Sequence, residues 1–183
     1  MKKLLTATAV AAALVGVGLW WLSDQSPATR VAEADGIKIG VVLGFTGPAE
    51  SLAGPMAAGA EMALKEASDS GAFLGGTTIT AVRADSTCID AAAATAAAER
   101  LVSAEQVKAI IGGLCSGATT AMLKNVAMAK GIVLFSPSAT SPALTTIPDN
   151  GLFFRASPSD ARQGQIIAQM LKEKGIKSAA LTY

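Results

Sequence analysis

Hydroxyl-bearing and small residues follow two apolar, β-branched runs of the sequence. The first motif is Ile111-Gly-Gly-Leu-Cys-Ser-Gly-Ala-Thr119, and the second is Ser136-Pro-Ser-Ala-Thr-Ser-Pro142. Neither motif contains Lys or Arg, so any ligand would be held by hydroxyl and backbone N–H groups. Charge-assisted hydrogen bonds from such groups can hold a carboxylate without a cationic side chain. The two motifs therefore predict a site for a small anionic or zwitterionic molecule, and a zwitterion fits better than a phosphate.

Each motif begins where a buried strand is expected to end. The segments 107–113 and 131–135 are short apolar runs rich in β-branched residues. In an open parallel sheet, ligands collect at the carboxyl ends of the strands, where helix N-termini offer unpaired N–H groups. We therefore expect the two motifs to converge at one edge of a sheet.

Strands and helices alternate from Asp35 onwards. Strands are predicted over 37–43, 78–84, 107–113, 131–135 and, after a Pro-rich loop, 151–156 and 176–183. Helices are predicted over 55–70, 90–103, 116–130 and 160–174, with Asp90 as an N-cap and Ser159 or Asp160 as another. This order predicts an α/β fold with a doubly wound, Rossmann-like parallel sheet covered by helices.

The composition excludes several classes of function. Net charge is +1, from 15 basic and 14 acidic residues, which gives no support for a nucleic-acid partner. The sequence has no His, so His-based catalytic triads and His metal ligands are absent. Gly44-Phe-Thr-Gly47 lacks the spacing of a dinucleotide-binding motif. We therefore expect no metal site and no cofactor.

Residues 1–34 form a separate segment with two possible roles. A basic start, Met1-Lys-Lys, precedes an apolar run over 4–22, and Ala32-Glu-Ala34 fits a signal-peptide cleavage site. The segment is therefore predicted to be a cleaved signal peptide, and the alternative is a retained membrane anchor formed by residues 4–22. Both alternatives place the rest of the chain outside the cytoplasm, in the periplasm.

Cys88 and Cys115 are the two cysteines of the sequence. An even cysteine count in an exported chain suggests one disulfide, and the alternative is two buried free thiols. Gly113-Leu-Cys-Ser-Gly117 also imitates the nucleophile elbow of a hydrolase, with Cys115 as the nucleophile. That chemistry needs a base, and no His is available. We therefore expect no enzyme.

The hydroxyl residues also have ordinary structural alternatives. Ser116 and Thr119 are placed where they could cap the helix over 116–130. The Ser and Pro residues of 136–142 are typical of turns. Asp85, at a strand end, is expected to bond a loop rather than to act in catalysis. Arg155 and Asp160 are expected as an ion pair, either at a hinge or in solvent.

Short motifs run in a fixed order from residue 37 to residue 164. They are Ile37-Lys-Ile-Gly-Val-Val42, Thr46-Gly-Pro48, Ala53-Gly-Pro55, Asp85 with Cys88, Ile110-Ile-Gly-Gly-Leu-Cys-Ser116, Ser136-Pro-Ser-Ala-Thr140, Pro142-Ala-Leu-Thr145, Phe154-Arg155, Pro158-Ser-Asp160 and Gln163-Gly164. Together they resemble the periplasmic substrate-binding proteins of ABC transporters for branched-chain amino acids, the Leu/Ile/Val-binding family with the type I periplasmic binding fold.

The resemblance implies two α/β lobes that close on a ligand. Residues 35–157 would form the first ligand-binding lobe, and residues 158–183 would form the hinge crossing and the start of a second lobe. The chain is thus expected to be truncated within that second lobe. The implied function is capture of an amino acid, branched-chain or similar, for delivery to an ABC transporter membrane permease. The alternative is a ligand-sensing receptor ectodomain of the same fold, anchored by residues 4–22.

The resemblance also implies a set of site residues. Ser116 would give its hydroxyl and N–H to the ligand carboxylate, and Thr140 would bind carboxylate and ammonium. Ser138 and Ala139 would offer main-chain groups, and Leu52 stands where relatives often carry an aromatic residue. The complete expected set of substrate-binding residues is Ser116, Thr140, Ser138, Ala139, Leu114 and Leu52. Cys88 and Cys115 match the family disulfide.

Overall fold

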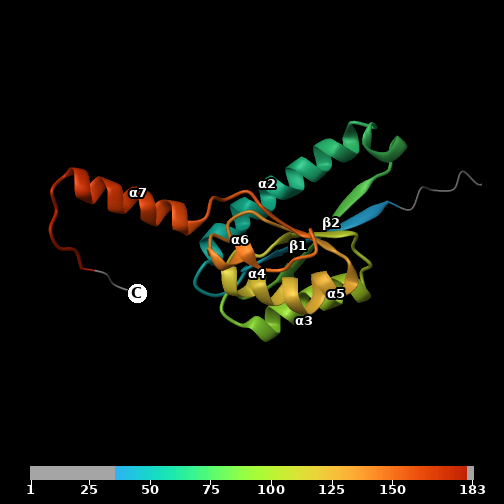
Figure 1. Cartoon of the computed structure of the whole chain (residues 1–183). Coiled ribbons are helices and arrows are strands. Elements are labelled where there is room, and N and C mark those ends of the chain that lie inside the picture. Colours follow the sequence, from blue (N-terminus) through green and yellow to red (C-terminus); the bar gives the residue numbers. More distant parts are fainter. Residues whose placement is uncertain (1–35, 181–183) are drawn as a thin grey trace, which may run out of the picture. The chain divides into compact units, whose positions relative to one another are not determined.

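The structure is a computed structural model of the chain and describes residues 36–180 (Figure 1). Within these residues one five-stranded sheet has the strand order β2-β1-β3-β4-β5. Its strands are β1 (Ile37–Leu43), β2 (Ile79–Asp85), β3 (Ala109–Gly112), β4 (Val133–Ser136) and β5 (Phe153–Arg155). All neighbouring strands are parallel, so their carboxyl ends meet at one edge. The predicted doubly wound α/β fold is confirmed.

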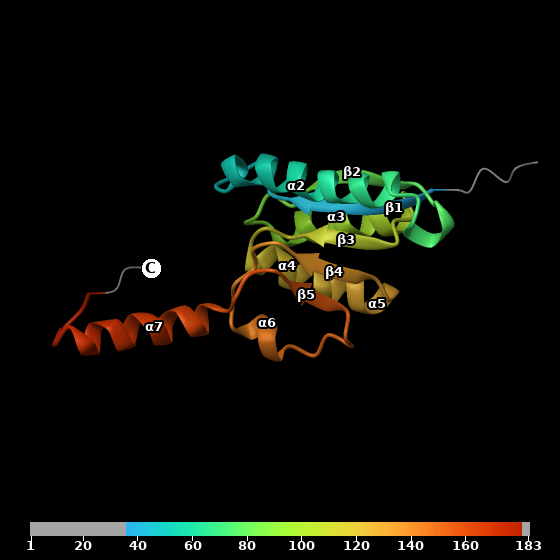
Figure 2. The ribbon, with the colours of Figure 1, turned by 90° about the horizontal axis from the view of Figure 1, so that it is seen from above.

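Helices lie on both faces of this sheet (Figures 1 and 2). Helix α2 (Glu50–Asp69) lies on one face, and α3 (Ala91–Ser103) lies on the other. Beside α3 runs a continuous helical segment made of α4 (Ser116–Met122), a π-helical turn (Leu123–Ala127) and α5 (Met128–Lys130). The remaining helices are a 3₁₀ turn (Phe73–Gly75), α6 (Ala143–Thr146) and α7 (Asp160–Glu173).

The core divides into two apolar clusters, one on each side of the sheet. Val41 and Leu43 of β1 pack with Ala53 and Ala57 of α2. Val42, between them in the sequence, belongs to the opposite cluster with residues of α3, α4, β4 and β5. Alternate side chains of a strand point to opposite faces, so β1 is buried on both sides. This double burial holds the strand end that leads toward the site.

Helix caps form where the sequence predicts them. The Asp90 carboxylate accepts hydrogen bonds from the N–H groups of Ala92 and Ala93, at 2.8 and 3.0 Å. The Ser159 hydroxyl accepts one from Ala161 N–H at 3.3 Å. Each bond satisfies an N–H that has no partner inside its helix. The starts of α3 and α7 are thus confirmed.

One predicted helix start is wrong, and one helix was not expected. Helix α2 begins at Glu50, so Pro55 lies inside it rather than at its start. Proline removes one helical donor, but Ala53 and Ala57 on the same helix are fully buried, and this packing offsets the loss. The Pro-rich loop also contains α6, which was not expected, and Leu144 anchors that helix in the core.

The last predicted strand is not present over 176–180. A strand needs a hydrogen-bonded neighbour, and none of the described residues pairs with this segment. Helix α7, which precedes it, has no buried residue. The expected signal peptide or anchor, residues 1–34, lies outside the described residues. Among the helices that are described, none combines the length and apolarity needed to cross a membrane.

Candidate functional site

Two neighbouring strand ends bring together five of the six expected ligand-binding residues, and Leu52, which lies on α2, is not among them. We call residues 113–116, between β3 and α4, the Ser116 loop, and residues 137–142, after β4, the Thr140 loop. The Ser116 hydroxyl oxygen accepts a hydrogen bond from Ser141 N–H at 3.1 Å. This contact places Ser116 beside the residue that follows Thr140. Among the described residues, no acceptor takes the Ser116 hydroxyl proton, so it can serve a ligand.

The start of α4 also presents backbone donors at this edge. Cys115 occupies the N-cap position and makes no side-chain cap bond. The first N–H groups of a helix have no partner inside the helix, and together they carry a partial positive charge. Ser116 is half-buried and Gly117 is exposed, so this edge is reachable from solvent. Ser116 is the first residue of α4, and its hydroxyl oxygen accepts from Ser141 N–H, so it does not cap the helix.

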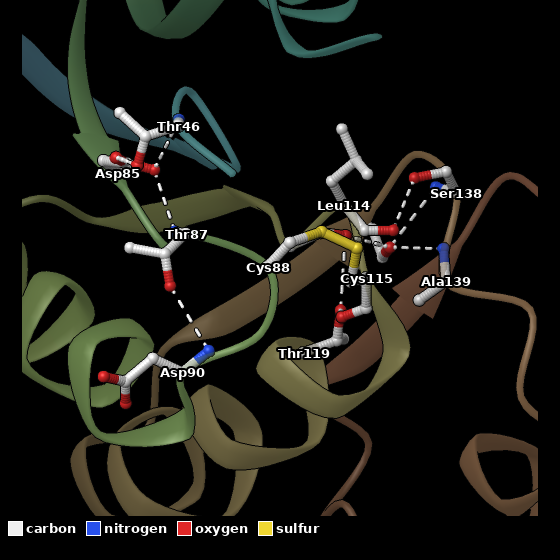
Figure 3. Close-up of a disulfide and its surroundings, with 12 residues drawn as sticks. Thr46, Asp85, Thr87, Cys88, Asp90, Leu114, Cys115, Thr119, Ser138 and Ala139 are labelled. Atoms are coloured by element: carbon white, nitrogen blue, oxygen red, sulfur yellow. Dashed lines mark hydrogen bonds between the residues drawn. A yellow bond between two sulfur atoms is a disulfide. The ribbon is translucent and has the colours of Figure 1, made fainter. Parts of the chain in front are cut away.

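Hydrogen bonds join the Thr140 loop to the Ser116 loop (Figure 3). Buried Ser136 donates its hydroxyl to Gly113 carbonyl at 2.7 Å and accepts from Ala139 N–H at 2.9 Å. The Ser138 hydroxyl donates to Leu114 carbonyl at 2.8 Å. Ser138 N–H also bonds Ser136, at 3.3 Å. The N–H groups of Ser138 and Ala139 are thus engaged within the protein, and these residues shape the loop.

Thr140 is bonded to the first residue of α7. Its hydroxyl donates to the Asp160 carboxylate at 2.8 Å, and its carbonyl accepts from Asp160 N–H at 3.0 Å. Within the described chain, Thr140 N–H has no hydrogen-bond partner. A hollow of about 310 Å³ lies beside Thr140, and it is lined further by Pro158, Asp160 and residues of α7. Thr140 therefore has a free donor and an adjacent open space, although Ser116 is not among the residues that line this hollow.

The two expected leucines lie in different environments. Leu114 is only 6% exposed and packs in the apolar cluster beneath α2. Leu52, on α2, is 52% exposed. Leu114 therefore supports the Ser116 loop from the core, whereas Leu52 presents an apolar side chain to solvent.

The Cys88–Cys115 disulfide is present in the structure, with the Cα atoms 5.3 Å apart (Figure 3). It links the segment after β2 to the residue that precedes Ser116. Thr119 is fully buried and donates its hydroxyl to the carbonyls of Gly113, at 3.2 Å, and Cys115, at 2.9 Å. Thr119 is therefore not an N-cap, as one alternative held, because it lies within α4 and holds the Ser116 loop from below. The disulfide also leaves Cys115 no thiolate for nucleophilic attack.

Asp85 organises a second pair of loops at the same edge (Figure 3). Its carboxylate accepts from the Thr46 hydroxyl at 2.5 Å, Thr46 N–H at 3.3 Å and Thr87 N–H at 2.8 Å. Burial raises the pKa of Asp85, but these bonds stabilise the charged form more, so its pKa lies below the ordinary 3.8. The expected loop-bonding role of Asp85 is confirmed.

Arg155 does not pair with Asp160, so the expected ion pair is wrong. The Arg155 guanidinium instead donates to the carbonyls of Ala139 and Ser141, at 3.2 and 2.9 Å. Arg155 takes part in none of the salt bridges formed by the described residues. The Asp160 carboxylate is used by Thr140 instead.

The sequence reasoning missed the residues that hold these loops. Ser136 was expected only as part of a motif, and Arg155 was expected to pair with Asp160 rather than to bond the Thr140 loop. The Ser157 hydroxyl, which donates to Ala139 carbonyl at 3.2 Å, was not expected as a contact. A serine at a strand end before proline is a known turn former, which was a usable signal for Ser136. No local signal marks Arg155, because its partners lie 10, 14 and 16 residues away. In the part of the chain that the structure describes, no cluster of His, Cys, Asp and Glu could hold a metal ion.

The chain is similar to known proteins of one family. Residues 36–183 match the protein family described as "Periplasmic binding protein". The Leu/Ile/Val/Thr-binding protein of Salmonella typhimurium is 32% identical over 146 residues, which are 80% of this chain and 39% of that protein. The chain therefore spans about two fifths of the length of this relative.

Two solved structures are similar in both sequence and fold. One is a branched-chain amino acid transporter substrate binding protein from Streptococcus pneumoniae in complex with isoleucine, with 32% identity and a TM-score of 0.67. The match covers 76% of this chain and 39% of that one. The other is a solute binding protein of an ABC transporter from R. palustris in complex with benzoate, with 26% identity and a TM-score of 0.64. That match covers 78% of this chain and 38% of the other.

Proposed function

Because the chain belongs to the periplasmic binding protein family, we propose that it captures an amino acid outside the cytoplasm and delivers it to an ABC transporter permease. The family is one of binding proteins rather than enzymes, so no reaction on the ligand is expected. The observation that carries the proposal is the contact between Ser116 and the Thr140 loop at two neighbouring strand ends. We propose that a single small ligand contacts both loops there.

The ligand carboxylate would bind between the two loops. The Ser116 hydroxyl, the N–H groups at the start of α4 and Thr140 N–H are the donors available for it. A desolvated carboxylate needs several such charge-assisted bonds, and these are about twice as strong as neutral ones. No cation is required, because the helix N-terminus already carries about half a positive charge.

The ammonium group of an amino acid would lie near Thr140. The Thr140 hydroxyl gives its proton to Asp160, so its oxygen lone pairs remain to accept from a donor. The Asp160 carboxylate adds a negative charge next to that oxygen. A zwitterion can use both the donors for a carboxylate and the acceptors for an ammonium group, whereas a simple carboxylic acid such as benzoate can use only the donors. This argument favours an amino acid, branched-chain or similar, over an aromatic acid.

The segment 158–183 is proposed to cross from this lobe to a second one that closes over the ligand. The relatives are more than twice as long as the matched region, which leaves room for such a lobe. Closure requires that the ligand bind the closed form more tightly than the open form. A receptor ectodomain anchored by residues 4–22 is the alternative. N-terminal sequencing of the exported protein separates the two, since a start near Asp35 fits a soluble transport component.

The proposal is tested by titrating the isotope-labelled protein with L-isoleucine, L-leucine and benzoate while recording amide NMR spectra. Isoleucine or leucine should shift the resonances of Ser116 and Thr140, and Ser116→Ala should weaken binding by about tenfold or more, the worth of one hydrogen bond to a charged group. Ser103→Ala is the matched control, because Ser103 is an exposed serine of α3 that bonds Glu99.

Absence of any shift at these two residues at saturating amino acid would exclude the proposed function for this chain. A shift caused by benzoate alone would replace the amino acid by an aromatic acid as the ligand.

A further inference from the structure

The Arg155 side chain holds the Thr140 loop by three contacts. One nitrogen of its guanidinium, Nη1, donates to both Ala139 carbonyl and Ser141 carbonyl, at 3.2 and 2.9 Å. The other, Nη2, donates to the Thr145 hydroxyl at 2.6 Å. The two carbonyls belong to the residues on either side of Thr140. Arg155 comes from β5, the strand at the edge of the sheet, so it joins that strand to the site loop.

The Ala139 carbonyl is part of the same peptide group as Thr140 N–H. This carbonyl accepts from Arg155 and also from the Ser157 hydroxyl, at 3.2 Å. Donors at a carbonyl polarise its peptide group, and the N–H at the other end becomes a stronger donor. One of the two donors here, the Arg155 guanidinium, carries a full positive charge. Thr140 N–H, which has no partner among the described residues, is therefore a strengthened donor.

Ser141 is held from two sides. Its N–H donates to the Ser116 hydroxyl oxygen, and its carbonyl accepts from Arg155. The distance between the Ser116 loop and the Thr140 loop thus depends on a residue that Arg155 fixes. Because no salt bridge in the described chain involves Arg155, its charge is directed at these carbonyls.

We propose that Arg155 is a positioning residue for the ligand carboxylate. It fixes the peptide groups on both sides of Thr140, so that Thr140 N–H keeps its direction and its donor strength while Ser141 stays bonded to Ser116. Arg155 itself does not touch the ligand. This inference rests on the proposed function for its effect on affinity, but its effect on the loop can be measured without any ligand.

The test compares Arg155→Gln and Arg155→Lys with the unaltered protein, each expressed as the full chain. Hydrogen exchange of the Ser141 amide reports the loop, and NMR titration with L-isoleucine reports affinity. Arg155→Gln should raise Ser141 amide exchange by about tenfold and weaken isoleucine binding by about tenfold. Arg155→Lys should lie between, because a single cationic nitrogen can still serve both carbonyls, as Nη1 does now.

Arg100→Gln is the matched control. Arg100, on α3, also donates to a backbone carbonyl, that of Arg83 at 3.4 Å, but it contributes nothing to the two loops. Its loss should leave both readouts unchanged. Thermal unfolding of each variant shows whether the fold persists, so that a loop effect is not mistaken for general loss of structure.

Unchanged Ser141 exchange in Arg155→Gln overturns the inference, whatever the ligand does. Raised exchange with unchanged isoleucine affinity overturns it as well, because the loop would then move without consequence. If the unaltered protein binds no amino acid, the proposed function fails, and Ser141 exchange alone decides whether Arg155 positions the loop.

Discussion

At the scale of single residues, the role of a hydroxyl group depends on its burial and on its hydrogen-bond partners. Thr119 and Ser136 are fully buried, and their hydroxyls satisfy the carbonyls of the Ser116 loop. Ser116 is half-buried and keeps its hydroxyl proton available. All three are small hydroxyl residues near strand ends, yet only Ser116 keeps a hydroxyl proton free for the proposed ligand. Burial and the position of the nearest carbonyl decide which role each takes.

Asp85 predicts a specific dependence of stability on pH. Its folded pKa lies below 3.8, so its contribution to stability is present above 3.8 and is lost as pH falls through the lower folded value. Asp85→Asn should lower the free energy of unfolding by roughly 1 kcal/mol at neutral pH. The difference from the unaltered protein should vanish in acid.

Urea unfolding from neutral pH to well below 3.8 measures this difference. Thr46→Val, which removes the hydroxyl that donates to Asp85, should raise the folded pKa of Asp85 toward its ordinary 3.8. A constant difference between Asp85→Asn and the unaltered protein across this range would contradict the assignment.

At the scale of elements, the site exists because parallel strands end at one edge and cross-links hold the loops that extend from them. β3 and β4 are neighbours in the sheet, so the loops after them are neighbours too. The disulfide adds a third segment by tying the stretch after β2 to the start of α4. These connections keep the Ser116 loop in place from the core, from the Thr140 loop and from the chain after β2.

The disulfide should contribute strongly to stability. Cys88 and Cys115 are 27 residues apart in the sequence, and closing a loop of that length stabilises a fold by about 3–4 kcal/mol through the entropy of the unfolded chain. Replacing both cysteines by serine should therefore reduce the free energy of unfolding by about this amount, as measured by urea denaturation.

Dithiothreitol should have the same effect on the unaltered protein and none on the double variant. A loss well below about 1 kcal/mol in the double variant would mean that the disulfide adds little beyond the surrounding hydrogen bonds.

At the scale of the whole molecule, no second surface within the described residues faces the proposed ligand site. The apolar side chains of Val133, Phe135 and Phe154 are 38%, 40% and 53% exposed, so β4 and β5 keep apolar groups in contact with solvent. Parallel sheets are normally covered on both faces. This openness supports the proposed second lobe, and the chain spans about two fifths of the length of the Salmonella typhimurium relative.

The isolated chain should accordingly bind an amino acid weakly. A few hydrogen bonds open to water contribute about 0.5–1.5 kcal/mol each, which corresponds to dissociation constants of about 1 mM. Isothermal titration calorimetry or NMR titration of the chain with L-isoleucine measures this value. A sub-micromolar constant would show that one lobe is sufficient and would contradict the two-lobe account.

The sequence by itself determined the fold class, most strands and helices, the disulfide partners and the two loops that meet. These features arise from hydrophobic periodicity, capping residues and the order of motifs, all of which act over short stretches of chain. The predicted late β-strand was wrong over 176–180, because a strand depends on a neighbour that local sequence does not reveal. The start of α2 was wrong because the burial of Ala53 outweighs the local signal of Pro55.

Only the tertiary structure decided which hydrogen-bond partner each side chain of the site has. Arg155 bonds two carbonyls rather than Asp160, and Asp160 takes the Thr140 hydroxyl instead. Thr119 lies within α4 and satisfies buried carbonyls rather than capping the helix. Hydrogen-bond partners are chosen by distance and direction in space, and residues far apart in sequence compete for them. The residue types at the site can therefore be read from the chain, but their partners can be read only from the fold.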